Sequence, residues 1–526
     1  MTPLYLNKEN QTANEPKVHP LIRESFFFVH SAGMRLAPEV LILELMREIF
    51  FDAVFGETTG SQELRPDLLA QDGSNILTVN EQAVVGIMKG RRKKTKGSNE
   101  NSFFAPAYPA LARYGWMRKN SERVVKNFLF SGPIAQFLWG SGYKDEVSAE
   151  MQKDMGSAVW KALIGEKSNI NNFPKDSDIL VATLGNKDFN FYKVLPFENF
   201  YERTKPTNNI VKIGEKDPIA ERITKDFLAI CEIEGVIPRM QWLQLLMTFL
   251  RFALPMWLLS QMRLTRLLHA WLIDAIEGNS IVSAGEIQQR ILTRNLGLLC
   301  PSITPTRELF EQIELYMKSR VEVNILLYTL EQIRHSQIAQ KRLALYEEGK
   351  SVVNIQELLI LAKNAAADIK KLERFTQVAP GLSINTYLIR EAEQFSAWQN
   401  PLMKGQGKNI DEFFRLLYKS ENGIDEGGYL LAPEGRGLKR GLQVFPGQLQ
   451  LKTMTFLASQ SKNASKSKGG AGKLVLQDVE DIFRQYGIDF SLAADVRPRL
   501  MNELKAMGLL TGSPDAGSSV TVNCPY

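Results

Sequence analysis

Apolar residues recur at helical spacing through the middle of the chain. Between Leu309 and Leu345 apolar positions repeat every three or four residues, and charged side chains occupy the other faces, which predicts amphipathic helices. Thr304 followed by Pro305, and Asn354 followed three residues later by Glu357, are typical of helix starts. We therefore expect a long helical scaffold over residues 216–425.

The most apolar stretch of this scaffold runs from Trp242 to Met262. It is long enough for a bilayer, but it contains Arg251 and Gln261, and arginines follow it. Pro255 is expected to break the apolar run, and Gly278 is expected to end it. This pattern favours a buried helical hairpin over a membrane span.

The N-terminal part is more mixed. Residues 38–54 form a helical pattern, whereas residues 178–184 and 188–194 look like short strands, so residues 1–215 are predicted to form an α+β region. A basic loop at residues 89–97 contains six positive residues and no negative one, and aromatic residues follow it. Such a pattern is typical of nucleic-acid contact, with a solvated loop as the alternative. The candidate contacts in this loop are Arg91, Arg92, Lys93 and Lys94.

Glycine-rich sequence marks a boundary before the C-terminal part. Between Glu421 and Gly447 there are seven glycines and two prolines. We predict a Gly-rich basic linker at residues 426–446 and a separate domain at residues 447–526. A second low-complexity break is expected from Ser459 to Lys473.

Three apolar stripes and two short strands follow in this C-terminal part. The second stripe covers Asp478 to Tyr486, and the third includes Leu500 and Leu504 and stops at Gly508. A turn-rich loop at residues 512–519 then separates two short β-type segments. The third helix, its Gly-Leu-Leu ending and the hairpin resemble the winged helix-turn-helix family. The resemblance covers about a sixth of the chain, and nothing comparable is seen in the rest.

In that family the third helix enters the DNA major groove, so the resemblance implies nucleic-acid contacts on its solvent face. From Arg436 to Lys505 there are twelve Lys or Arg against six Asp or Glu, an excess that suits phosphate binding. However, the loop at residues 512–519, the expected wing, has no Lys or Arg. The candidate contacts here are Arg497, Arg499, Asn502, Lys505, Lys466, Lys468 and Lys473.

Composition and motifs limit the cofactors and metal sites that the chain is expected to have. The chain has 526 residues, a formal net charge of +6 and three widely separated cysteines, which fits a cytoplasmic protein without a disulfide framework or zinc site. The stretch Lys468 to Leu474 lacks the residues of a phosphate-binding loop, so no cofactor is expected. His269 is expected to be a core histidine.

The sequence thus predicts a mainly α protein with an N-terminal α+β region, a long helical middle and a C-terminal winged helix. We expect a non-catalytic subunit that binds nucleic acid, most simply duplex DNA, and holds a protein partner on its helical middle. We expect it to serve as the recognition component of a bacterial multi-protein DNA-processing or phage-defence (antiviral) assembly. Two alternatives stay open: a structural adaptor whose winged helix binds protein, and an atypical metal-dependent nuclease using Asp178, Asp188, Lys187 or the Glu215-Lys216 pair.

Overall fold

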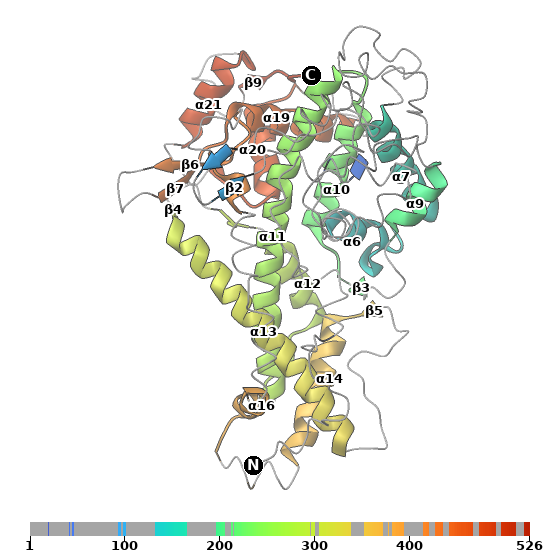
Figure 1. The fold of residues 1–526 in the computed structure, drawn as a ribbon, viewed down its shortest axis with the longest axis vertical. Helices are drawn as coiled ribbons and strands as arrows, with labels where there is room; N and C mark the ends of the chain where they lie inside the picture. The colour runs from blue at the N-terminus through green and yellow to red at the C-terminus, as the bar shows by residue number, and fades with distance from the viewer. Residues whose placement is uncertain are drawn as a thin grey trace.

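The protein is mainly α-helical (Figure 1), as its periodicity predicts. The computed structural model describes residues 19, 42, 45–46, 93–95, 98–100, 132–165, 196–205, 212–213, 215–294, 296–299, 304–337, 352–371, 377, 381–393, 414–419, 427–434, 441–466, 473–490, 496–511 and 520–526. The strands expected at residues 178–184 and 188–194 lie outside this set, so the N-terminal α+β region stays a prediction. Within residues 89–97, only Lys93–Thr95 (β1) is described, and it pairs with Ser98–Glu100 (β2).

Helix α11 (Arg239–Glu277) is the 39-residue axis of the molecule (Figure 1). The predicted end is confirmed, because Gly278 adopts φ +97° and its N–H donates to the carbonyls of the last turn. The predicted break at Pro255 is wrong, since the helix continues through it. An internal proline costs about 3 kcal/mol, but Pro255 and its apolar neighbours are buried, so packing outweighs the lost hydrogen bond.

This single helix replaces the expected helical hairpin. By length and composition α11 is the one helix of the described chain that qualifies as a membrane span, yet 83% of its most apolar window is buried within the protein.

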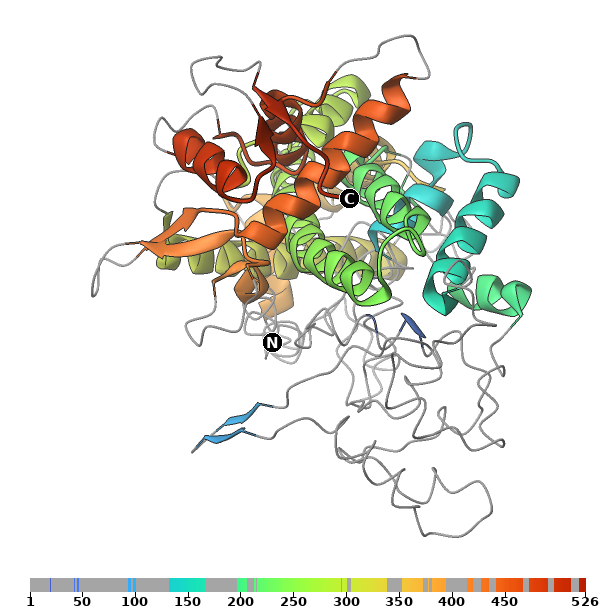
Figure 2. The same cartoon turned by 90° about the horizontal axis from the view of Figure 1, so that it is seen from above.

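Two hydrophobic clusters form along α11, one at each end. The upper cluster packs α11 against α10 (Pro218–Glu232), the N-terminal helices and the C-terminal elements (Figure 2). The N-terminal helices are α6 (Pro133–Trp139), α7 (Ala149–Ile164) and α9 (Phe197–Thr204). The lower cluster packs its other end against an arm of four helices: α12 (Ala284–Thr293), α13 (Thr306–Gln337), α14 (Ile355–Lys370) and α16 (Ile384–Glu393).

Helix starts in the arm are partly as expected. Asn354 caps α14, because its Oδ1 accepts from the N–H of Gln356 at 2.8 Å. Thr304 and Pro305 instead form strand β4, and α13 begins at Thr306. Pairing of β4 with a distant strand therefore takes these residues out of the helix.

The predicted linker contains a hairpin. Strands β6 (Leu431–Glu434) and β7 (Gly441–Val444) pair antiparallel, and β7 also pairs with β4. All four residues of β7 are buried. Apolar residues on both sides of residues 426–446 belong to the same upper cluster, so this stretch joins packed parts of the molecule.

The C-terminal elements form a small helical unit with a sheet. Helix α19 (Gln448–Lys466) is followed by α20 (Leu476–Gln485), α21 (Val496–Ala506) and the strands β8 (Leu510–Thr511) and β9 (Thr521–Val522). Val475, just before α20, forms an antiparallel bridge with Thr521, while β8 pairs with the other edge of β9. The order across the sheet is therefore Val475, β9, β8. The break expected from Ser459 to Lys473 is wrong over its first part, since α19 continues to Lys466, and residues 467–472 lie outside the described residues.

Buried charged groups join these parts. Asp217 caps α10 by accepting from the N–H groups of Ile219 and Ala220, and its carboxylate also receives the guanidinium of Arg294 at 2.5 Å. Neither side chain is more than 1% exposed. This pair holds the end of α12 against the start of α10.

A second buried carboxylate connects α10 to the C-terminal unit. Asp226 pairs with Arg222 and accepts a 2.8 Å hydrogen bond from the hydroxyl of Tyr486, the residue after α20. The ring of Tyr486 packs edge-on against Phe252 of α11, with centroids 4.9 Å apart. Burial raises the pKa of the Tyr486 hydroxyl well above its ordinary value, so it stays protonated and keeps donating.

The Asp226–Tyr486 contact predicts a specific loss of stability. Tyr486→Phe leaves the ring in place but removes the donor, which should lower the free energy of unfolding by about 1.5–3 kcal/mol, as for other hydrogen bonds to buried charged groups. Urea denaturation of the full chain measures this. Tyr526→Phe is the matched control, because Tyr526 is 37% exposed and should change stability by less than about 0.5 kcal/mol. Equal unfolding midpoints for both variants and the parent would contradict the prediction.

Candidate nucleic-acid interface

Helix α21 is amphipathic, and its apolar side is fixed as expected. Val496, Leu500 and Leu504 are each at most 2% exposed, and Pro498 lies in the first turn, where its missing N–H costs no helical hydrogen bond. Gly508 ends the helix with φ +70°, a conformation that favours glycine. Burial of Val496, Leu500 and Leu504 therefore determines which faces of α21 point outward.

Arg497 does not point freely into solvent. Its Nε lies 2.7 Å from Oε1 of Glu480 on α20, and the Glu480 side chain is only 2% exposed. Burial raises the pKa of Glu480, an effect that the facing Arg497 partly offsets. The pair therefore fixes α21 against α20.

Arg499 is also engaged within the protein. Its Nη1 donates to Oε1 of Gln443 on β7 at 2.5 Å, and its guanidinium lies 4.4 Å from the centroid of the Phe445 ring. Gln443 is buried. Arg499 thus connects α21 to the β6–β7 hairpin, a contact that sequence spacing cannot reveal because 56 residues separate the partners.

Two free energies decide whether Arg497 is available to bind DNA: the cost of breaking its ion pair and the gain from a contact to a base. Breaking a buried ion pair costs about 3–5 kcal/mol, less where one partner is partly exposed, as Arg497 is at 34%. A good bidentate contact to a base contributes about 1–3 kcal/mol. Moving Arg497 from Glu480 to a base edge therefore brings little or no net gain.

The remaining predicted contacts divide into exposed and undescribed residues. Asn502 and Lys505 on α21 and Lys473 before α20 are exposed. Among the described residues, none forms an ion pair with Lys505 or Lys473 or a hydrogen bond with the amide of Asn502, so these three side chains are available to a ligand. Lys468, Arg91 and Arg92 lie outside the described residues, as do the side chains of Lys466, Lys93 and Lys94. The structure thus does not place the basic loop relative to α21.

The nuclease alternative requires a metal site. In the described part of the chain, no group of three or more His, Cys, Asp or Glu residues is placed so that it could hold a metal ion. Asp178, Lys187 and Asp188 lie outside that part. Lys216 pairs with Glu146, whereas Glu215 accepts from the N–H of Ile355 at 2.9 Å. Both side chains of this pair therefore serve contacts between elements.

Nε2 of His269 on α11 lies 2.8 Å from Oε2 of Glu322 on α13, and the two side chains are 17% and 20% exposed. The imidazole thus joins two helices of the scaffold, but it is partly exposed and does not lie in the core where the sequence places it.

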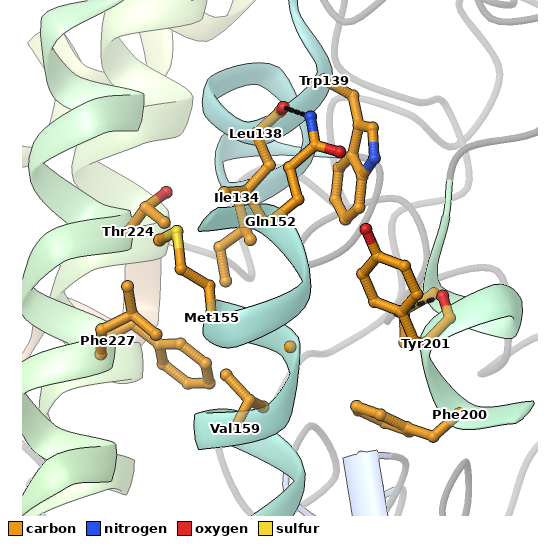
Figure 3. A pocket seen from close by; sticks show the side chains of 13 residues that line it. Ile134, Leu138, Trp139, Gln152, Met155, Val159, Phe200, Tyr201, Thr224 and Phe227 are labelled. Carbon is orange, nitrogen blue, oxygen red and sulfur yellow. Dashed lines mark hydrogen bonds between the residues drawn. The ribbon is translucent and has the colours of Figure 1, made fainter. Parts of the chain in front are cut away.

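An apolar pocket lies between α6, α7, α9 and α10 (Figure 3). Its polar groups are largely used internally: Nε2 of Gln152 donates to Leu138, and the hydroxyls of Thr204 and Thr224 donate to backbone carbonyls. Gly156 allows close packing here, since a Cβ would lie 2.9 Å from the Tyr201 ring. No charged side chain lines this pocket.

Comparison with known proteins gives no family. The chain matches no protein-family model, no curated protein and no solved structure.

The Arg497–Glu480 pair predicts a stability effect that nucleic-acid binding alone would not produce. Arg497→Ala leaves a buried carboxylate without its partner and should lower the free energy of unfolding by about 1–3 kcal/mol. Adding Glu480→Gln should recover part of the loss, because the amide needs no counter-charge. Lys505→Ala serves as the exposed control and should change stability by less than about 0.5 kcal/mol. Urea denaturation of the four proteins checks this, and equal losses for Arg497→Ala and Lys505→Ala would count against the pair.

Glu215 predicts a pH effect. Burial raises its pKa from the ordinary 4.5 to about 7, and Glu357 on α14 adds to the rise. Because the folded state then binds this proton more tightly than the unfolded state, the contribution of Glu215 is full below about pH 4.5 and is lost as pH rises through about 7.

Glu215→Gln keeps an acceptor for Ile355 but removes the titration, so its advantage over the parent should grow from pH 5 to pH 8, to about 2–3 kcal/mol. Urea unfolding of both proteins across this range measures the difference. Parallel stability profiles would show that Glu215 titrates normally.

Proposed function

We propose that the C-terminal unit is a winged helix and that the protein is a non-catalytic DNA-binding subunit. The observation that carries the proposal is the element order: one helix, a bridged segment at Val475, two helices and a hairpin whose second strand pairs with that segment. This is the order of helices and strands in a winged helix-turn-helix. In that arrangement α21 is the helix that faces DNA.

Exposure and charge support DNA as the ligand. Lys505 and Asn502 lie on the solvent side of α21, and Lys473 is exposed before α20. Phosphate contacts by such cations supply most sequence-independent affinity. A further contact by the basic loop at residues 89–97 belongs to the same proposal.

The helical arm is proposed to hold a protein partner. Leu292 on α12 and Ile360 on α14 are 50% and 41% exposed, although these helices pack against each other. We assign the partner contact to these two exposed apolar side chains. The subunit would then bring DNA to the catalytic members of a DNA-processing or phage-defence assembly.

A structural adaptor is the second candidate. It is favoured by the internal engagement of Arg497 and Arg499, which leaves fewer cations on α21 than the sequence suggests. An adaptor should show no salt-dependent affinity for nucleic acid.

Titration of the full chain with a fluorescent 25-base-pair duplex at several salt concentrations tests the proposal. The parent should bind, with log affinity falling linearly against log salt. Lys505→Ala should lower the slope by about 0.9 and the affinity about five- to tenfold at 0.1 M salt, because each phosphate contact contributes about that slope for B-DNA.

Lys153→Ala is the matched control, since Lys153 is also exposed but lies on α7. It should leave both slope and affinity unchanged. No salt-dependent binding by the parent would favour the adaptor, and equal effects of the two lysine variants would remove α21 from the interface.

A further inference from the structure

The two halves of α21 differ in what they can offer a ligand. In helix-turn-helix proteins the N-terminal residues of the recognition helix contact the base edges. In α21 this half contains Arg497 and Arg499, the side chains best suited to reading guanine. Both are directed at the protein: Arg497 at buried Glu480 and Arg499 at Gln443 and Phe445.

These contacts hold the arginines firmly. The Nε and Nη2 atoms of Arg497 are shielded from solvent beside Glu480, although the side chain as a whole is 34% exposed. Gln443 is 4% exposed, and its strand β7 pairs on both sides, with β4 and β6. In both overall views the hairpin lies beside α21 (Figures 1 and 2). The N-terminal half of α21 is thus already occupied by this hairpin and α20.

The C-terminal half presents a different chemistry. Lys505 is a point charge that suits a phosphate, and it lacks the planar fork that matches a base edge. Asn502 is the one exposed amide beside it, and Glu503 between them accepts from Gln448 on α19. The loop expected to be the wing, residues 512–519, carries no Lys or Arg for a minor groove.

We infer that α21 contacts the phosphodiester backbone of duplex DNA and does not read its base sequence. The inference rests on the proposed function and narrows it. The ligand would be duplex DNA of any sequence, and the contact between α21 and the phosphates would be electrostatic. Specificity of the assembly for a DNA target would then have to come from another member.

Affinity across sequences tests this with the full chain. Three 25-base-pair duplexes, one mixed, one A·T-rich and one G·C-rich, should bind within about threefold of one another at the same salt concentration. Selection from a duplex pool with a randomised centre should enrich no motif. Asn502→Ala should leave the three affinities in the same ratio, whereas Lys505→Ala should weaken all three equally, about five- to tenfold at 0.1 M salt.

The outcomes separate the two proposals. A selected motif that binds more than about thirtyfold tighter than the pool would overturn the inference while leaving DNA binding in place. Absence of binding to all three duplexes would overturn both. Arg499→Lys adds a check with the charge retained: a changed preference among the duplexes would show that Arg499 reads bases, and an unchanged ratio supports its role as a contact to β7.

Discussion

Helix α11 imposes the main constraint on this protein, because it is apolar on nearly all of its faces and must be covered on all of them. A helix with one apolar stripe needs one neighbour, whereas α11 buries residues from Trp242 to Ile276 and therefore needs a surround at both ends. The N-terminal helices, α10 and the C-terminal unit cover one end, and the arm helices cover the other. The same burial explains why Pro255 is tolerated within the helix.

Buried charges determine how the covering elements are oriented. Hydrophobic contact alone lets helices slide or rotate, but a buried carboxylate must meet a specific partner to avoid a large desolvation cost. Asp217 meets Arg294, and Asp226 meets Arg222 and Tyr486. The second group connects α10 directly to the end of α20. The C-terminal unit is consequently held against the helical body, and a duplex on α21 would have a defined orientation relative to the arm.

Local features of the fold were predictable from sequence, and non-local ones were not. Gly278, Gly508 and Asn354 act through their own backbone or the adjacent turn, and each ends or starts a helix as expected. The stripe of Val496, Leu500 and Leu504 is likewise a property of one helix. By contrast, β4 replaces the expected helix start at Thr304 because β7, over a hundred residues later, pairs with it. No window of sequence contains that information.

At the candidate interface, too, the sequence indicates which residues are charged but not which of them are engaged by distant partners. Counting Lys and Arg around α21 locates a basic part of the sequence, but it treats each cation as available. In the sequence Glu480 looks like an ordinary surface acid of α20. In the folded protein its side chain is buried, and Arg497 lies against it. Arg499 is drawn to Gln443 and Phe445, which lie in a stretch whose glycines suggest a linker. Of the four polar residues that the helical pattern assigns to the solvent face of α21, the two arginines therefore stabilise the fold. Asn502 and Lys505 stay exposed on α21, and a lysine suits the regular charge of a phosphate backbone more than the varied edges of bases.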